Sequence, residues 1–248
     1  MEIAKSAKLI GTKLIGIGEE GIKNLESISH KLNDNIYLEK INIRQDVDKE
    51  YVRALLDGID VLFLTYSSED KEALNIVKAI GIMANERRVL SIGLNSSTKE
   101  VKDSLEIDRE IHINDENTYK LFGIFNMMLD SMLDTCMINI DLTDLKEVIM
   151  GENGIKYSCE EFENAKSQEE IVKTLFDNMI QTREELAGKK GIVFLEMGSN
   201  DFKSEDMVQL NNFLTLIKDS CEDTYESIFS IYLKEELNGK VKVGLIYN

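Results

Sequence analysis

Three glycines near the start of the chain, Gly16, Gly18 and Gly21, have the G-x-G-x-x-G spacing that binds phosphate in dinucleotide sites. They follow a predicted strand and open a predicted helix, which is the context that this fingerprint requires. A phosphate would lie at the helix N-terminus, but Glu19 and Glu20 stand there, and each like-charge contact at about 4 Å costs on the order of several kcal/mol. The alternative is a tight strand-to-helix turn in which both glutamates favour the helix dipole, and the charges favour this second interpretation.

A second group of polar residues, Asn139, Asp141 and Asp144, lies between a long apolar helical pattern and the start of another helix. Carboxylates three residues apart at a helix start lie on one face of the helix. Asp141 has the type and place of an N-cap, and Asp144 would favour the helix dipole. Capping alone explains both aspartates, but it does not exclude a functional role, because a functional loop must also be held rigid.

Cysteine and histidine usage predicts no metal site. Cys136, Cys159 and Cys221 are far apart and odd in number, so they form neither a metal spacing nor a disulfide framework. His30 and His112 have no Ser or Cys partner at a meaningful spacing. Unpaired cysteines fit a reducing cytoplasm, and we expect the protein there.

The elements that must position these residues alternate in the first half of the chain. Short apolar runs predict strands, and the segments between them predict helices. The predicted strands cover residues 13–18, 35–43, 60–65 and 89–94, and the predicted helices cover 21–28, 51–56 and 73–83. This alternation is typical of a mostly parallel, Rossmann-type sheet covered on both faces.

A long helix of about residues 117–137 divides the chain. Its apolar residues recur at helical spacing over about four turns; they are Leu121, Phe125, Met128, Leu129, Met132 and Cys136. We therefore expect a first domain of 1–114, a central helix of 115–138 and a second domain of 139–248.

The second domain has a mixed α+β pattern. A capping box of Ser167 and Glu170 opens a helix that runs to about Leu186, and Asn238-Gly239 is a strong hairpin turn signal. The other expected elements are helices at 145–150 and 207–217, a strand at 191–197, and hairpin strands at 228–233 and 241–246.

Composition excludes several classes of partner. The net charge is −17 over 248 residues, and such a surface repels nucleic acid and anionic membranes. The first residues do not form a signal peptide, and no apolar run is long enough to span a membrane.

The ordered set of motifs resembles the FtsZ/tubulin superfamily. Residues 139–149 resemble that family's NxDFADVxxVM segment, and residues 188–193 resemble its GxRGVL strand. Further segments that are similar to the family are 12–18 and 57–64 in the first half and 198–202 and 232–243 in the second. The resemblance covers nearly the whole chain and implies an α/β tubulin/FtsZ-like fold.

The resemblance also implies functional roles. In the family, the loop corresponding to Asn139, Asp141 and Asp144 reaches into the nucleotide site of the next subunit in a filament, where it polarises the attacking water. Gly16, Gly18 and Gly21 match a first phosphate loop that is richer in glycine in the family. Phe122 and Asn126 match, across a gap, residues that stack on and hydrogen-bond guanine, although a core phenylalanine beside a solvated asparagine explains them as well.

The departures from the family bear on GTP. The family carries a GGGTGTG loop after the third strand, whose amides cradle phosphate because glycine allows close backbone approach. Here residues 65–72 read Thr-Tyr-Ser-Ser-Glu-Asp-Lys-Glu, with no glycine and three carboxylates. The segment between the second strand and the helix at Tyr51 is also far shorter than in the family, as is the region before the long helix.

Three functions remain open. The first is an FtsZ-like protein with lost or weak GTP binding that self-associates or regulates a filament of a cognate FtsZ in cell division or the cytoskeleton. The second is an active GTPase of the FtsZ/tubulin type, which binds GTP or GDP through the three glycines alone. The third is a dinucleotide-binding oxidoreductase in which Arg44 or Asp46 reads the ribose or its phosphate. The sequence favours the first, with no cofactor expected.

Overall fold

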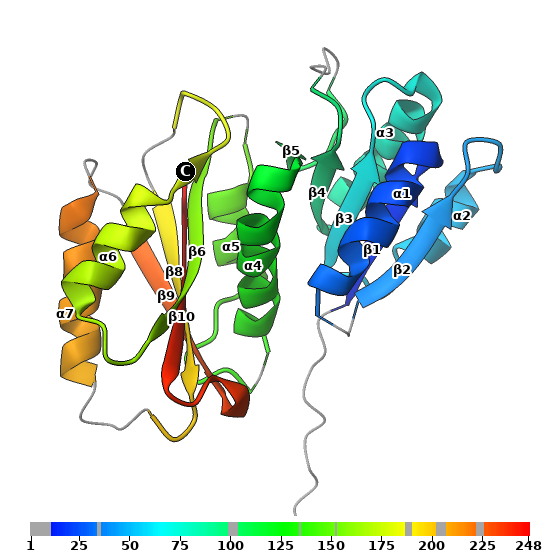
Figure 1. The fold of residues 1–248 in the computed structure, drawn as a ribbon. Coiled ribbons are helices and arrows are strands. Elements are labelled where there is room, and N and C mark those ends of the chain that lie inside the picture. The colour runs from blue at the N-terminus through cyan, green and yellow to red at the C-terminus, as the bar shows by residue number, and fades with distance from the viewer. Residues whose placement is uncertain are drawn as a thin grey trace, which may run out of the picture. The chain divides into compact units, whose positions relative to one another are not determined.

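The computed structural model describes residues 11–33, 36–98, 104–133, 135–151, 153–186, 190–201, 207–221 and 226–248. Within this part of the chain, one compact unit holds residues 11–119 and 150–151, and the other holds 120–149 and 153–248 (Figure 1). The predicted start of the second strand at residue 35 lies outside the described residues, as do residues 188, 189 and 202 of the family-like segments.

The first unit is a parallel α/β sheet. Its strand order is β2-β1-β3-β4-β5, and every neighbouring pair is parallel. The elements are β1 Thr12–Ile17, α1 Gly18–Ile28, η1 Ser29–Lys31, β2 Ile36–Ile41, α2 Lys49–Leu55, β3 Val61–Tyr66, α3 Lys71–Glu86, β4 Leu90–Asn95 and β5 Arg109–His112. The four predicted strands and three predicted helices are confirmed to within a few residues. Strand β5 was not predicted, because Arg-Glu-Ile-His is short and mostly polar.

Helices cover both faces of this sheet, with α1 on one face and α2 and α3 on the other (Figure 1). Strands β3 and β4 are buried along their whole length, as central strands of a doubly covered sheet must be. The core on the α2 and α3 side includes Ile15, Leu62, Leu64, Val77 and Ile80, none of which is exposed. This packing fixes the carboxyl ends of β1 and β3 side by side.

The second unit is a mixed sheet with the order β7-β6-β10-β8-β9, in which only β8 and β9 are parallel among the described pairs. Its elements are α4 Asp115–Ser131, which begins in the first unit, α5 Leu142–Ile149, β6 Lys156–Glu163, α6 Gln168–Asp177, β7 Ile180–Gln181, β8 Lys190–Gly198, α7 Met207–Ser220, β9 Glu226–Lys234, η3 Glu235–Leu237 and β10 Lys240–Tyr247. Helices α4 and α5 cover one face and α6 and α7 the other (Figure 1). The predicted Rossmann-type sheet followed by a mixed sheet is confirmed.

Helix α4 packs closely on its sheet because glycine lies on both sides of the contact. A Cβ on Gly123 would come 2.6 Å from Cys159 Sγ, and a Cβ on Gly244 would come 2.8 Å from Met127 Sδ. Met128, Leu129 and Met132 are buried, as their helical spacing predicted.

The predicted C-terminal hairpin is wrong. Strand β8 lies between β9 and β10, so these two strands are not hydrogen-bonded neighbours. Asn238 and Gly239 do form a turn, with Gly239 at φ +80°, but the turn follows η3 and leads the chain across β8. A turn dipeptide fixes local backbone geometry, whereas strand pairing here depends on which apolar faces pack together.

Two helices end earlier than predicted, and one long strand was not predicted. The helix that opens at the confirmed capping box of Ser167 ends at Asp177 instead of Leu186. Helix α4 ends at Ser131, six residues before the predicted end at 137, because the chain turns there to reach β9. Strand β6 was not predicted, since its Lys-Tyr-Ser-Cys-Glu-Glu-Phe-Glu sequence has no clean alternation.

Candidate functional site

Two of the three glycines in the turn of residues 16–21, called here the glycine turn, are needed for packing. A Cβ on Gly21 would lie 2.3 Å from the carbonyl oxygen of Thr65, and a Cβ on Gly16 would lie 2.8 Å from the carbonyl oxygen of Gly21. The Thr65 hydroxyl donates to the Gly21 carbonyl at 2.8 Å. The spacing therefore brings α1 close to β1 and β3, whether or not a phosphate binds.

Gly18 begins α1 and differs from the other two. Its φ is +73°, a conformation that favours glycine, and its N-cap residue Ile17 makes no side-chain capping bond. Glu19 and Glu20 have side chains that are 86% and 57% exposed, and both carboxylates pair with Lys23, at 3.5 and 2.7 Å. These glutamates are thus held along the solvent side of α1 and not across its start.

The backbone amides of the β3–α3 loop, residues 67–70, and of the first turn of α3 are hydrogen-bonded within the chain. Phosphate-binding loops leave N–H groups free for the ligand, and buried N–H groups otherwise need an internal acceptor. Here the acceptors are Asn95 Oδ1 for Ser68 N–H at 3.1 Å, Ser67 Oγ for Glu69 at 3.3 Å, the Ser67 carbonyl for Asp70 at 3.1 Å, and Asp70 Oδ1 for Glu72 and Ala73 at 3.0 Å each.

A buried polar network closes the same edge of the sheet. Asn95, which is fully buried, accepts from the amides of Ser68 and Ser97 and donates to Glu110 Oε1 at 3.0 Å. The Tyr66 hydroxyl donates to the same Glu110 oxygen at 2.7 Å. Burial and the Glu110 carboxylate hold the pKa of Tyr66 well above its ordinary value, so it remains a donor. The loops after β3 and β4 are therefore tied to each other and to β5 without a ligand.

Asp70 joins this edge to the glycine turn. It is the N-cap of α3, and its second carboxylate oxygen, Oδ2, lies 2.9 Å from the position that a Cβ on Gly18 would occupy. One carboxylate thus lies against the starts of both α1 and α3.

In the second unit, residues 139–144, called here the acidic loop, present polar groups outward. Asp141 accepts a hydrogen bond from the Asp144 amide at 2.9 Å, which is N-cap geometry for α5. Asn139 and Asp141 are exposed, and Asp144 is half-buried. Capping by Asp141 thus leaves the loop accessible.

The acidic loop is pinned to the sheet on its N-terminal side. Ile138 forms an antiparallel bridge with Ile231 of β9, through bonds of 3.2 and 3.1 Å. The Cys136 thiol donates to the Ile231 carbonyl at 3.0 Å, and burial raises its pKa, which keeps it protonated. The amide of Ile140 donates to the Ser131 carbonyl at 3.0 Å. These bonds hold the start of the acidic loop against β9 and against the end of α4.

A buried charge cluster lies where α4 ends on this sheet. Lys234 Nζ is 2.7 Å from Asp130 Oδ2 and 3.0 Å from Glu196 Oε1, and Lys242 Nζ is 3.9 Å from Glu196 Oε2. Burial raises the pKa of Glu196 despite the two lysines. Burial lowers the pKa of Lys234, but Glu196 and Asp130 raise it overall. Lys234 links the end of α4 to β8 and β9.

The predicted base-binding residues lie on α4 in the second unit, whereas the glycine turn belongs to the first. Phe122 is 1% exposed and makes an edge-to-face contact with Phe125, with ring centroids 5.8 Å apart. Asn126 is half-buried. Phe122 thus occupies a core position.

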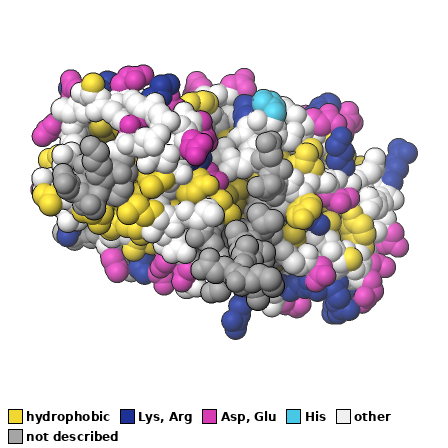
Figure 2. All heavy atoms as spheres, turned by 90° about the horizontal axis from the view of Figure 1, so that it is seen from below, with side chains coloured by type: hydrophobic (Ala, Val, Ile, Leu, Met, Phe, Trp, Pro, Cys, Tyr) yellow, Lys and Arg dark blue, Asp and Glu magenta, His cyan; other side chains and the backbone are white. Residues whose placement is uncertain are grey.

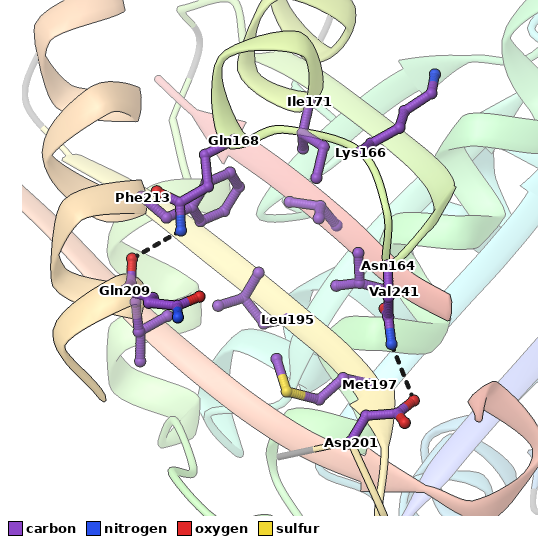
Figure 3. Close-up of a pocket in the computed structure, with 12 residues that line it drawn as sticks. Asn164, Lys166, Gln168, Ile171, Leu195, Met197, Asp201, Gln209, Phe213 and Val241 are labelled. Carbon is purple, nitrogen blue, oxygen red and sulfur yellow. Dashed lines mark hydrogen bonds between the residues drawn. The ribbon is translucent and has the colours of Figure 1, made fainter. Parts of the chain in front are cut away.

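A cavity of about 280 Å³ lies between the starts of α6 and α7 and the sheet (Figure 3). Its floor is apolar, and carboxamides form much of its rim, with Gln168 donating to the Gln209 carbonyl. Among the described lining residues, the one carboxylate, Asp201, accepts from Asn164 and from the Gly239 amide, and Lys166 points away from the cavity. The lining residues that the structure describes contain no acid–base pair poised for chemistry.

Apart from Phe122 and Asn126 on α4, the structure groups the predicted residues in two places. Gly16, Gly18 and Gly21 form the glycine turn, and Asn139, Asp141 and Asp144 form the acidic loop. Asp70, Asn95 and Lys234 were missed. For Asp70 a signal existed, because an aspartate directly before an apolar helical pattern is an N-cap candidate. Lys234 and Asn95 act through residues far away in sequence, which no local pattern shows.

Surface charge on the described residues agrees with the composition. On the face drawn in Figure 2, Lys and Arg side chains stand singly or in small groups among Asp and Glu. None of the helices that the structure describes is both long and apolar enough to cross a bilayer. In the same part of the chain, no three His, Cys, Asp or Glu side chains gather as a metal-binding group.

The fold is that of FtsZ and its relatives. No family model and no curated protein sequence matches the chain. Among solved structures, it is similar to an empty FtsZ dimer from M. jannaschii, with 12% identity, 97% of this chain and 88% of that chain covered, and a TM-score of 0.63. It is also similar to CetZ from Methanosaeta thermophila, with 9% identity, 96% and 86% coverage and a TM-score of 0.62. A third similar structure is GDP-bound CetZ1 from Haloferax volcanii, with 9% identity, 96% of this chain and 94% of that chain covered, and a TM-score of 0.56.

Proposed function

We propose that this chain is an FtsZ-like cytoskeletal protein that binds GTP weakly or not at all and acts on a filament through its acidic loop. The filament is formed by further copies of the chain or by a cognate FtsZ-type protein in the cytoplasm. The fold shared with FtsZ and CetZ over nearly the whole chain is the starting point.

The observation that carries the proposal is the internal satisfaction of the β3–α3 loop. Five backbone amides between Ser68 and Ala73 already have acceptors within the chain. A phosphate would have to displace them, and it would meet the carboxylate of Asp70 as it did so. The free energy lost with those hydrogen bonds, together with the charge repulsion, would offset much of the free energy gained by binding the phosphate.

The acidic loop supports the second half of the proposal. Its carboxylates are accessible, and its backbone is fixed by Asp141 and by the bridge between Ile138 and Ile231. A preorganised loop can position a water molecule or a cation in a neighbouring subunit without an ordering cost. The chain would thus offer the aspartate half of a shared site but no nucleotide half.

Such asymmetry predicts an effect at one end of a filament. A chain that joins through its acidic loop presents no nucleotide to the next subunit, so growth stops or slows there. Substoichiometric protein should therefore change the assembly or GTP turnover of a cognate FtsZ, measured by light scattering and phosphate release.

Two variants make this experiment specific. Asp144→Ala should abolish the effect while the protein still unfolds cooperatively. Asp177→Asn, at an exposed position at the end of α6, removes the same charge elsewhere and should leave the effect intact. No effect of the wild-type protein on assembly, together with a purely destabilising Asp144→Ala, would reduce the loop to a helix cap.

The alternative is an active GTPase, which the glycine turn favours, because the N-cap residue Ile17 makes no side-chain capping bond at the start of α1, where Gly18 has φ +73°. Calorimetry with GTP, GDP and magnesium separates the two functions. We expect dissociation constants weaker than micromolar, and micromolar or tighter binding would overturn the proposal and favour the GTPase instead.

A further inference from the structure

The starts of α1 and α3 form a shared anion-binding geometry in the first unit. Strands β1 and β3 are parallel neighbours, with Gly16 paired to Thr65, so the helices that follow them begin at the same edge of the sheet. Backbone N–H groups at such helix starts attract anions, and a ligand commonly lies outside the carboxyl ends of parallel strands.

An anion already lies at this place, and the chain itself supplies it. Asp70 Oδ1 accepts from the amides of Glu72 and Ala73, both at 3.0 Å. Asp70 Oδ2 lies 2.9 Å from the Cβ position of Gly18, followed by Ala73 Cβ at 3.4 Å and Ile43 Cγ2 at 3.6 Å. The carboxylate is therefore bound by one helix start and packed against the other.

We propose that Asp70 is a specificity-determining residue, an internal anion that excludes phosphate groups from the paired starts of α1 and α3. This inference rests on the proposed function and assigns the loss of phosphate binding to one side chain. The excluded ligand class is a polyphosphate, free or carried by a nucleoside.

Three features of Asp70 exclude a phosphate. Its carboxylate takes up the two α3 amides that a phosphate oxygen would use. Its negative charge repels a phosphate over a few ångströms, where solvent screening is incomplete. Its Oδ2 fills the space beside Gly18. Gly18 has a left-handed backbone and, unlike Gly16 and Gly21, is not needed for a close helix–strand contact.

Two substitutions separate the effect of the space and amides that Asp70 occupies from the effect of its charge. Asp70→Gly frees both amides, removes the charge and opens the space beside Gly18, and glycine is still an acceptable N-cap. Asp70→Asn keeps the side-chain volume and the cap but removes the charge. We expect Asp70→Gly to tighten tripolyphosphate binding about tenfold or more, and Asp70→Asn to tighten it less. Calorimetry and tripolyphosphate-dependent thermal shifts measure both.

The matched control is Asp48, the N-cap of α2 in the same unit. It accepts from the Tyr51 amide at 2.8 Å, in the way that Asp70 caps α3. Asp48→Gly makes the same chemical change, but Asp48 supplies none of the three atoms nearest to the Cβ position of Gly18. We expect Asp48→Gly to leave tripolyphosphate binding unchanged. Glu72→Gln, in the first turn of α3, controls for a general loss of negative charge.

The outcomes distinguish this inference from the proposed function. If wild-type protein and folded Asp70→Gly both fail to bind tripolyphosphate, Asp70 is not the excluding residue, and the proposed function stands. If Asp48→Gly or Glu72→Gln gains as much as Asp70→Gly, the effect is one of net charge and the inference is wrong. If wild-type protein already binds tightly, both the inference and the proposed function fail. A cooperative melt of each variant shows that it folds.

Discussion

Two aspartates in this protein cap helices with similar hydrogen bonds, but one carboxylate stays exposed and the other is packed against a second helix start. Asp141 accepts from the Asp144 amide at 2.9 Å and stays exposed in the acidic loop. Asp70 accepts from the Glu72 and Ala73 amides at 3.0 Å, but its free oxygen is packed against Gly18. The same type of cap therefore leaves a carboxylate exposed to solvent in one unit and, in the other, places it where an anionic ligand would bind.

The difference comes from what surrounds each cap. Backbone bonds of Ile138, just before the acidic loop, and of Ile140, within it, hold the loop, and Asp141 adds the cap of α5. The β3–α3 loop is fixed by its own side chains Ser67 and Asp70 and by Asn95 at the end of β4. A loop that is held by its own polar groups has few of them left for a partner.

The largest expected effect is on the support of the acidic loop. Lys234→Met removes the cation between Asp130 and Glu196 and leaves two buried carboxylates facing each other. Breaking a buried ion pair in this way costs about 3–5 kcal/mol of unfolding free energy. Urea denaturation measures the loss. A cost below about 1 kcal/mol would show that the cluster is solvated and does not anchor the end of α4.

The corresponding test in the first unit is Asn95→Ala. The substitution leaves the amides of Ser68 and Ser97 without their acceptor, at about 1–3 kcal/mol for each buried group. Chemical denaturation measures the total cost, and limited proteolysis reports whether the β3–α3 loop opens. Tyr66→Phe is the milder control, because it removes one donor to Glu110 and keeps the ring. Equal small effects from both variants would argue against an internally held loop.

These contrasts also show which parts could be read from sequence. Apolar runs such as Val61–Tyr66 are long enough to specify central strands, and the capping box at Ser167 specifies a helix start, so both were predicted. The pairing of β10 with β8 and β6 was not, because Val243 and Leu245 would alternate in the same way beside any neighbour. Lys234 is separated from Asp130 by 104 residues, and only the fold brings the two charges together.

A smaller effect is expected from pH. Burial raises the pKa of Glu196 in the folded protein, so the folded state binds this proton more tightly than the unfolded state does. Its contribution to stability is therefore full below the unfolded pKa of about 4.3 and is lost as the pH rises through the raised folded value. Lys234, Lys242 and Asp130 face this carboxyl, and Lys234, whose pKa is raised by Glu196 and Asp130, stays charged in that range.

Glu196→Gln isolates this contribution from those of the other carboxyls. The wild-type protein should lose stability relative to Glu196→Gln as the pH rises from about 4, and the difference should level off above the folded pKa. Thermal melts of both proteins at matched pH values measure the difference. A difference that stays constant with pH would mean that Glu196 titrates alike in the folded and unfolded states.

The smallest expected change in stability comes from Asp141→Asn, and it bears most directly on the comparison between the two caps. Asparagine caps helices about as well as aspartate, so the unfolding free energy should change by less than about 0.5 kcal/mol. The exposed charge is nevertheless removed from the acidic loop. If the loop acts on a cognate filament through its carboxylates, Asp141→Asn weakens that action while its melting curve matches wild type. Asp48→Asn makes the same exchange at the cap of α2 and should leave the filament effect unchanged. Loss of the effect in Asp48→Asn, or full activity of Asp141→Asn, would contradict the assignment of the effect to the carboxylates of the acidic loop.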